Sequence, residues 1–500
     1  MWTTRATWIA LALTIVFLAR GLPPETFFVG DPGVKLIAAR AAMKHPAKPL
    51  EVSLPQIGRQ PVPLVDPFFV FHGDHTHAIT SEAFPVLSAP FIALFGIRGA
   101  YVLPALGFLV AIWASARLAA AVGIASSAAT MMLAAALGTP LLFYGLEFWE
   151  HAPAVAIAAI ATTVFVENTT TEETGEHGSG RVFLAGVLFG ISILLRPEAV
   201  WFLLALAASS RFLKPSPRWS AIGVAAAGTA MAVAPLVIYS LVHFGTLAPP
   251  HVETQAELLT IAWLNTRAGI MSAWFVPDAL RATPLWGCAL VLTAVSGFVM
   301  PGRRGSARKF LASAVLLDVA LVVMTAPNDG GGQWGPRYLL LAFIPASVLL
   351  ADALHVLKGR TAARIAATVL LLAAGVWIQR SGYRELRGTK IIYGHVLDLV
   401  RQQVPAEGYA VTDLWWLDQV TAAATSDRTI LFAASEESRR DAFRRLHNAG
   451  VATVTVFISR DESAGVGAWS REACYETAGQ TAIETRNLVA ITLEQHPECK

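Results

Sequence analysis

Long apolar runs follow one another through the first 380 residues, and they limit what this chain can fold into. A helix needs about 20 apolar residues to cross the hydrocarbon core of a bilayer, and fewer where neighbouring helices bury it. Charged residues gather between the runs. The pattern predicts about eleven transmembrane helices, of which the fourth to sixth are the shortest, at residues 6–22, 101–122, 124–148, 152–165, 182–195, 199–212, 219–244, 284–300, 310–324, 338–356 and 363–378.

Composition supports the same class. Of the 500 residues, 55% are hydrophobic and only 15% are charged, and the mean hydropathy is +0.54. A soluble domain carries about 25% charged residues. The formal net charge of +3 is small, and no basic block is interleaved with aromatics, so nothing indicates a nucleic-acid partner. We therefore predict a polytopic α-helical membrane protein in contact with membrane lipids.

The short basic loops predict the orientation, because Lys and Arg favour the cytoplasmic side. Placing Arg5 in the cytoplasm puts Arg117 and the basic loops at 211–218, 301–309 and 358–364 on the same side. With eleven spans, the segment after residue 378 then lies outside. The first run is followed by GLPPE and lacks a small-x-small cleavage site, so we interpret it as a membrane helix and not as a signal peptide.

Acids, histidines, arginines and aromatics concentrate on the predicted outer face. The first outer loop, about residues 23–99, begins with GDPGVKLIAAR, in which Pro and Gly favour a tight turn around an acid, followed by a helix with its basic residues on the polar side. Later loops read LEFWEHAP, LLRPEAVW and NDGGGQWGPRY. The residues singled out are Asp31, Lys35, His72, Asp74, Glu147, Glu150, His151, Arg196, Glu198, Trp334, Arg337 and Tyr338.

Each of these groups has a simpler interpretation. Asp31 can be an ordinary turn residue. Arg196 and Glu198 can form a helix-end ion pair, although charges at membrane depth are costly and tend to be paired or functional. The histidines around Asp74 match no strong zinc pattern, and a hydrogen-bonding role or a plain surface loop fits them better. Glu147 and Glu150 share one face if the helix continues through them, and Trp334 and Tyr338 can belong to an aromatic belt.

Taken together, the outer residues suit one kind of chemistry. An acid can act as general base towards a hydroxyl. The planar fork of an arginine can hold a phosphate and stabilise it as a leaving group. Gly330, Gly331, Gly332 and Gly335 allow the backbone to approach a ligand closely. The combination favours transfer of a group from a lipid phosphate.

The order and sidedness of these passages resemble the GT-C superfamily of polytopic glycosyltransferases, in particular its aminoarabinose transferase and protein O-mannosyltransferase branches. The resemblance covers about residues 1–380. It is carried by GDPGVKLIAAR, SEAFPVLSAPFIALFGIRGAYVLPALG, TPLLFYGLEFWEHAPAVAIAA, GVLFGISILLRPEAV and GGQWGPRYLLLAFIP. It implies a polyprenyl-phosphate sugar donor, an acceptor hydroxyl on a lipid, polysaccharide or protein, and a bacterial inner membrane.

The resemblance also implies roles for single residues. Asp31 corresponds to the general base on the acceptor hydroxyl, and attack opposite the departing phosphate inverts configuration. Because Pro32 follows where some members carry a second acid, we expect no metal, and no other cofactor is implied. Arg337, then Arg196 and Lys35, are expected to bind the lipid phosphate. Acceptor or sugar contacts are expected from Glu150, with Glu147 as its substitute, and from His151, Asp74, His72, Glu198, Tyr338 and Trp334.

The tail, residues 381–500, changes character. GYAVTDL, RTILFAA and VATVTVFIS read as buried strands, and a helix capped by Ser435 and ended by Gly450 lies between the last two. Strand–helix–strand order predicts a small α/β accessory domain with parallel pairing. Of the 3 cysteines, Cys288 lies in the eighth run. Cys474 and Cys499 can form a disulfide if the tail is outside the cytoplasm, or remain free thiols.

Two other functions stay open. A transporter or flippase for a lipid-linked or anionic substrate would also need intramembrane charges, but the chain shows no convincing internal repeat. A polymerase or ligase that uses a lipid diphosphate donor usually has its large loop later in the chain. Neither alternative explains the long first outer loop with its acid.

Overall fold

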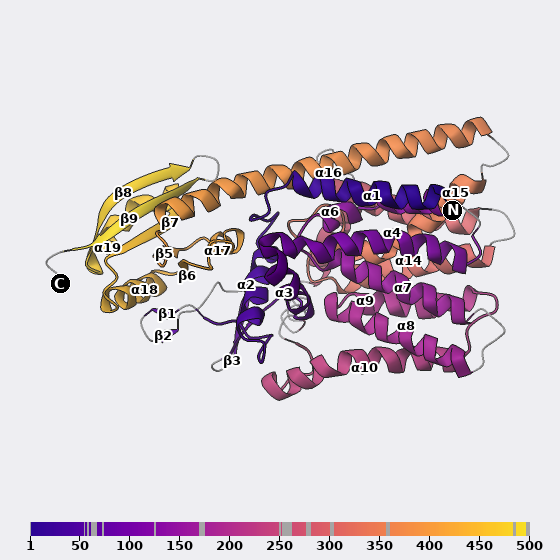
Figure 1. Cartoon of the computed structure of the whole chain (residues 1–500), viewed down its shortest axis with the longest axis horizontal. Helices are drawn as coiled ribbons and strands as arrows, with labels where there is room; N and C mark the ends of the chain where they lie inside the picture. The colour runs from indigo at the N-terminus through magenta and orange to yellow at the C-terminus, as the bar shows by residue number, and fades with distance from the viewer. Residues whose placement is uncertain are drawn as a thin grey trace. The chain divides into compact units, whose positions relative to one another are not determined.

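Helices dominate the computed structural model of the chain (Figure 1). It describes residues 2–54, 56–57, 60–61, 68–72, 75–124, 127–169, 176–249, 252, 263–276, 282–300, 305–356, 361–483 and 487–496. Two compact units can be distinguished. Unit 1 comprises Met1–Gly21 and Tyr101–Glu385, and unit 2 comprises Leu22–Ala100 and Leu386–Lys500.

Unit 1 is helical in the residues described. Among the described residues, seven helical segments of the chain are long and apolar enough to cross a membrane, which confirms an integral membrane protein. Its helices are α1 (Trp2–Arg20), α4 (Val102–Ala121), α5 (Ala128–Leu137), α6 (Leu141–Gly145), α7 (His151–Thr169), α8 (Glu176–Leu195), α9 (Ala199–Ser209), η2 (Ser210–Phe212), α10 (Trp219–Phe244), α12 (Trp263–Phe275), α13 (Ala282–Val299), α14 (Gly305–Thr325), η3 (Arg337–Ala342), α15 (Phe343–Val356) and most of α16 (Thr361–Gln403).

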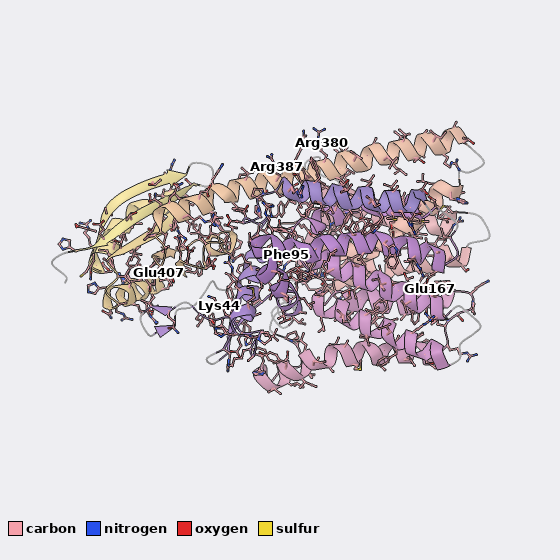
Figure 2. All side chains as sticks on the ribbon, in the orientation of Figure 1. Lys44, Phe95, Glu167, Arg380, Arg387 and Glu407 are labelled. Atoms are coloured by element: carbon pink, nitrogen blue, oxygen red, sulfur yellow. The ribbon has the colours of Figure 1, made fainter. Side chains whose placement is uncertain are left out.

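Glycines let several of these helices approach closely. A side chain at Gly107 on α4 would overlap the backbone of Ala152 and Pro153 on α7, and one at Gly186 on α8 would overlap the Ala225 carbonyl of α10. Small residues at helix contacts are typical of membrane bundles. At the other end of the first pair, Arg117 of α4 binds Glu167 of α7, which is labelled in Figure 2, at 2.7 Å.

The third apolar run, 124–148, is not one helix. It divides into α5 and α6 at Gly138–Pro140, because Pro140 has no N–H to continue the ladder. The side-chain amide of Gln379 on α16 donates to the carbonyl of Thr139 at 2.7 Å and to that of Ala136 at 3.3 Å. These bonds satisfy carbonyls that the broken helix leaves open. Residues 147–150 lie between α6 and α7, so the condition under which Glu147 and Glu150 would share a helix face is not met.

Unit 2 joins the first loop to the C-terminal region. The loop folds into α2 (Asp31–Lys44), α3 (Ala83–Phe95) and the short strands β1 (Gln56–Ile57), β2 (Gln60–Pro61), β3 (Phe69–His72) and β4 (His75–Ala78), with η1 (Gly96–Tyr101) after α3. The predicted tight turn at GDPG is present as the start of α2: the Gly33 N–H donates to the Gly30 carbonyl at 2.8 Å, and Asp31 is the first residue of the helix. The helix predicted after it is present.

The C-terminal sheet confirms the predicted strand–helix–strand order. Strands β5 (Tyr409–Thr412), β6 (Thr429–Phe432) and β7 (Thr453–Ser459) pair in parallel, and Ser435 caps α18 (Glu436–Asn448). The sequence did not predict two further strands, β8 (Tyr475–Ile483) and β9 (Leu488–Gln495), which extend the sheet antiparallel in the order β6-β5-β7-β9-β8. Shorter helices are α17 (Leu417–Val420), η5 (Arg460–Gly465) and α19 (Val466–Glu472). Cys474 is disulfide-bonded and Cys288 is free, whereas Cys499 lies outside the described residues.

A buried acid in α17 makes the stability of unit 2 depend on pH. Burial raises the pKa of Asp418 from 3.8 to about 8, so between these values the unfolded chain releases a proton that the folded chain keeps. Stability therefore falls as pH rises from about 4 to 8, by up to about 1.4 kcal/mol per pH unit. We expect Asp418→Asn to raise the Tm by several degrees at pH 8 and to change it little at pH 4, measured by differential scanning fluorimetry. Asp427→Asn, at a half-exposed acid of the same region, should show no such difference.

Candidate functional site

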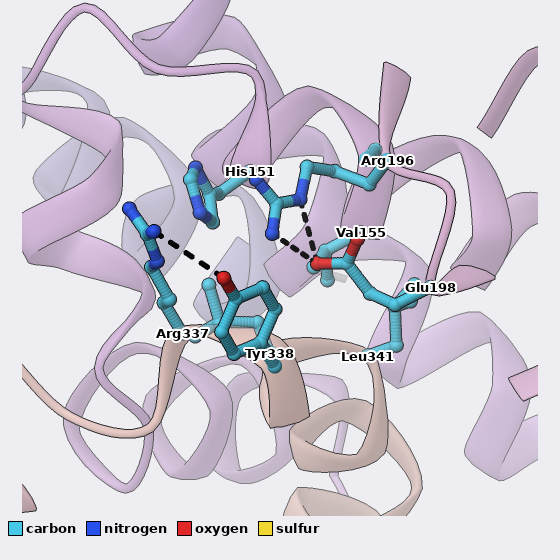
Figure 3. Close-up of a pocket in the computed structure, with 9 residues that line it drawn as sticks. His151, Val155, Arg196, Glu198, Arg337, Tyr338 and Leu341 are labelled. Carbon is cyan, nitrogen blue, oxygen red and sulfur yellow. Dashed lines mark hydrogen bonds and ion pairs between the residues drawn. The ribbon is translucent and has the colours of Figure 1, made fainter. Parts of the chain in front are cut away.

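A small cavity of about 10 Å³ in unit 1, room for about one water molecule, brings several of the singled-out residues together (Figure 3). It lies where the first turns of α7, the Arg196–Glu198 segment after α8 and the 3₁₀ helix η3 meet. Its walls are His151, Ala154, Val155, Arg196, Glu198, Arg337, Tyr338, Leu340 and Leu341.

Arg196 is the centre of an ion network beside this cavity. Its Nη1 donates to Glu150 at 3.0 Å and its Nε to Glu198 at 2.6 Å, and Nη2 bonds the same Glu198 oxygen. The Glu150 side chain is only 2% exposed, so its carboxyl group is desolvated and the guanidinium is its partner there. Burial lowers the pKa of Arg196, but the carboxylates of Glu198 and Glu150 raise it by more. The helix-end ion pair considered from the sequence is therefore present, and it includes a third residue.

Two guanidinium groups lie near the ring of Tyr338. The Arg196 carbon Cζ is 5.5 Å from the centre of this ring and that of Arg337 is 5.2 Å away, distances at which a cation is attracted to an aromatic face. The Tyr338 hydroxyl donates to Asn328 Oδ1 at 3.3 Å and accepts from Arg337 Nη2 at 3.4 Å. Tyr338 thus joins the network around Arg196 to Arg337.

The glycine-rich loop before η3 is organised by Gln333. Its amide nitrogen donates to the Asp329 carbonyl, and its Oε1 accepts from the Arg337 N–H at 2.9 Å, so one side chain bridges both ends of the loop. Gly330 has φ +100° and its missing side chain leaves room for Gln333. The glycines therefore allow a compact loop that fixes the start of η3 and the Arg337 backbone with it.

Two aromatic rings lie next to the imidazole ring of His151. The His151 ring stacks on Tyr144 at 4.8 Å and lies 5.3 Å from Trp149. Two predicted contact residues are elsewhere. Trp334 stacks on Phe143 at 5.6 Å, and Glu147 accepts from the Phe148 N–H at 3.0 Å. Neither Trp334 nor Glu147 lines the cavity.

The residues singled out in the first loop belong to unit 2. Asp31 binds Lys35 Nζ at 3.5 Å. The Lys35 side chain is buried, with only 2% exposed, so the expectation that it lies on a polar helix face was wrong. Helix α2 packs against α3 and α17, so it is not a surface helix with a free polar face. Among the histidines, His75 binds Glu51 at 3.1 Å and His77 bonds the Leu50 carbonyl at 3.0 Å. His72 is described only as the end of β3, and Asp74 lies outside the described residues.

Three polar residues of this region were not singled out from the sequence. Asn328 and Gln333 form the hydrogen bonds described above. Asp318 on α14 is fully buried and interacts electrostatically with Glu198, and within the described part of the chain neither of its carboxylate oxygens has a hydrogen-bond partner. An acid inside the apolar run 310–324 is a signal that would have found it, because intramembrane acids are rare and tend to be functional. Among the described residues, no three His, Cys, Asp or Glu side chains form a group that could hold a metal ion.

Comparison with known proteins shows the class of fold. No protein-family model and no curated protein sequence matches this chain. Among solved structures, ArnT from Cupriavidus metallidurans bound to undecaprenyl phosphate matches with a TM-score of 0.64 and 12% identity over 97% of both chains. The Archaeoglobus fulgidus oligosaccharyltransferase in complex with Zn and sulfate matches with a TM-score of 0.52 and 14% identity over 93% of this chain and 69% of its own. The chain therefore has the GT-C fold, which its resemblance to that superfamily had implied.

Proposed function

We propose that the chain is a membrane glycosyltransferase that moves a sugar from a polyprenyl-phosphate donor to an acceptor hydroxyl on the outer face of the membrane, with inversion. The observation that carries the proposal is the pair of guanidinium groups near the Tyr338 ring, beside a cavity in a unit with the GT-C fold. The ArnT structure with the same fold holds undecaprenyl phosphate. An anionic lipid headgroup is a ligand that the planar fork of an arginine suits.

The two arginines take different roles in this proposal. Arg196 is compensated by Glu150 and Glu198, so its contribution is to hold these acids in place for the acceptor or the sugar. Arg337 follows the ordered glycine-rich loop and is the residue for the donor phosphate. Lys35, buried against Asp31, is assigned to positioning that acid and not to the lipid.

The reaction needs only one base from the chain. The Asp31 carboxylate takes the proton of the acceptor hydroxyl, and the acceptor oxygen forms a bond to the anomeric carbon. The bond from that carbon to the phosphate oxygen breaks, and its electron pair leaves with the polyprenyl phosphate. Arg337 stabilises the charge that develops on this leaving group.

The proposed topology keeps about eleven spans, a cytoplasmic N-terminus and an inner-membrane location. In it, residues 1–380 form the catalytic membrane domain and residues 381–500 an accessory domain on the outer side. The disulfide-bonded state of Cys474 supports that side, because disulfides persist outside the reducing cytosol. The acceptor is proposed to be a lipid, a polysaccharide or a protein.

Removing the Arg337 side chain tests the proposal. Purified protein is given radiolabelled polyprenyl-phosphate sugars and membrane extract as acceptor. We expect wild type to transfer sugar and Arg337→Ala to lose about 10- to 100-fold in kcat/KM for the donor, because charged hydrogen bonds contribute about 1.5–3 kcal/mol. Arg337→Lys should recover part of this, since it restores the charge without the fork.

Arg211→Ala is the control, because Arg211 is exposed on η2 and rests on Phe212. It should transfer at the wild-type rate. If the wild-type protein moves a lipid-linked substrate across the membrane of proteoliposomes but transfers no sugar, the glycosyltransferase proposal is wrong and the flippase alternative takes its place.

A further inference from the structure

The helix that carries Trp274 comes from a different part of the chain than Arg337. Helix α12, Trp263–Phe275, precedes α13 in sequence and is fastened to the C-terminal end of α14. The guanidinium of Arg267 donates to the carbonyls of Val323 and Ala326. These are carbonyls that a helix end leaves without partners, so Arg267 fixes α12 at this place.

From this anchor, Trp274 reaches the glycine-rich loop. Its indole N–H donates to the Asp329 carbonyl at 2.7 Å. The same carbonyl accepts from the side chain of Gln333, which in turn holds the Arg337 N–H. The indole is therefore bonded to the first residue of a two-step hydrogen-bond chain that ends at the backbone of Arg337.

A second contact links Trp274 to Arg196 and Arg337 indirectly, through the ring of Tyr338. The Trp274 ring centre lies 6.1 Å from that of Tyr338, the ring that both Arg196 and Arg337 face. The Trp274 side chain is fully buried. A buried ring with one hydrogen bond to the loop and one ring contact to Tyr338 leaves the start of η3 little freedom to move.

We propose that Trp274 is a positioning residue for the anionic headgroup of the donor lipid, acting through Asp329, Gln333 and Tyr338 on Arg337. This inference rests on the proposed function. Trp274 does not touch the phosphate in this scheme. It fixes the loop so that the Arg337 fork is already placed before the lipid binds, which lowers the entropic cost of binding.

The test measures binding of radiolabelled undecaprenyl phosphate to the full-length protein in detergent. Trp274→Phe keeps the ring beside Tyr338 and removes the N–H. We expect its Kd to be about 5-fold weaker than that of wild type, the worth of one net hydrogen bond of about 1 kcal/mol. In a background of Arg337→Ala the same change should have no further effect, because the residue through which it acts is gone.

The matched control is Trp263→Phe on the same helix. The Trp263 indole donates to the Met324 carbonyl at 3.3 Å, at the end of α14 and not in the loop, and the phenyl ring keeps the surface beneath Arg267. Its Kd should equal that of wild type. Equal weakening in both variants, or additive weakening in the Arg337→Ala background, would overturn the inference and leave Trp274 a general packing residue.

The binding readout separates this inference from the proposed function. A wild-type protein that binds undecaprenyl phosphate but transfers no sugar contradicts the glycosyltransferase, while the Kd ratio of Trp274→Phe still decides the role of Trp274. Where transfer is measured, the donor KM should rise in Trp274→Phe and the acceptor KM should not. A wild-type protein that does not bind the lipid contradicts both.

Discussion

Asp31→Asn is expected to reduce sugar transfer by about 10²- to 10⁴-fold, the usual contribution of a general base. The amide has the shape of the carboxylate but cannot take the proton of an acceptor hydroxyl. The substitution therefore removes the chemistry and keeps the packing of α2. The initial rate of transfer from the best donor measures it, at saturating acceptor.

The surroundings of Asp31 favour a carboxylate that is held and still reachable. It is the first residue of α2, where the helix dipole favours a negative charge. Lys35, one turn further along the helix, binds Asp31 at 3.5 Å. The Asp31 side chain remains 27% exposed. A buried partner on one side and an open face on the other is the geometry that a base acting on a separate substrate needs.

Another acid of the same loop provides the control for Asp31→Asn. Glu25 binds Arg401 in a partly exposed pair, with 42% of the Glu25 side chain accessible. Glu25→Gln loses a comparable ion pair without the proposed base and should transfer at close to the wild-type rate. If Asp31→Asn keeps full activity with normal thermal stability, the base is another acid, and Glu150, held by Arg196, is the next to substitute.

The helices could be predicted because each apolar run carries its own signal. The run 219–244 matches α10 residue for residue, and the alternation of strand and helix in the tail gave the parallel pairing. The antiparallel β8 and β9 were missed. Their pairing joins strands through a register that only the folded sheet defines. The break of 124–148 at Pro140 was visible in the sequence, but the apolar composition on both sides outweighed it.

The site was predicted in its residue types but not in its connections. Arg196 and Glu198 are neighbours in sequence, whereas the bond from Arg196 to Glu150 spans 46 residues and depends on how α7 meets α8. The burial of Lys35 likewise follows from contacts of α2 that no local pattern encodes. Periodicity reports which face of one helix is apolar. It does not report which partner covers that face.

Substitution of Gly33, two residues after Asp31, is expected to have a large effect on the free energy of unfolding. Gly33 lies inside α2, and a Cβ there would overlap the backbone carbonyl of Gln419 in α17. On helix propensity alone, Gly33→Ala should stabilise the protein by about 1 kcal/mol. Because the obstacle is backbone that no rotamer change can move, we expect a destabilisation of about 1–3 kcal/mol instead, the usual cost of overpacking. The Tm of the purified protein measures the sign.

Two companion variants show whether backbone contact is the cause. Gly388→Ala on α16 makes the same change in a helix interior with open space around it, so it should raise the Tm. Gly30→Ala meets the side chain of Gln419, so Gln419→Ala should relieve it, but the same change should not relieve Gly33→Ala. A Tm for Gly33→Ala that rises with that of Gly388→Ala would mean that α17 does not pack on α2 here. In the expected case, the two glycines of GDPG are required for the contact with α17, and Asp31 between them is the residue left for chemistry.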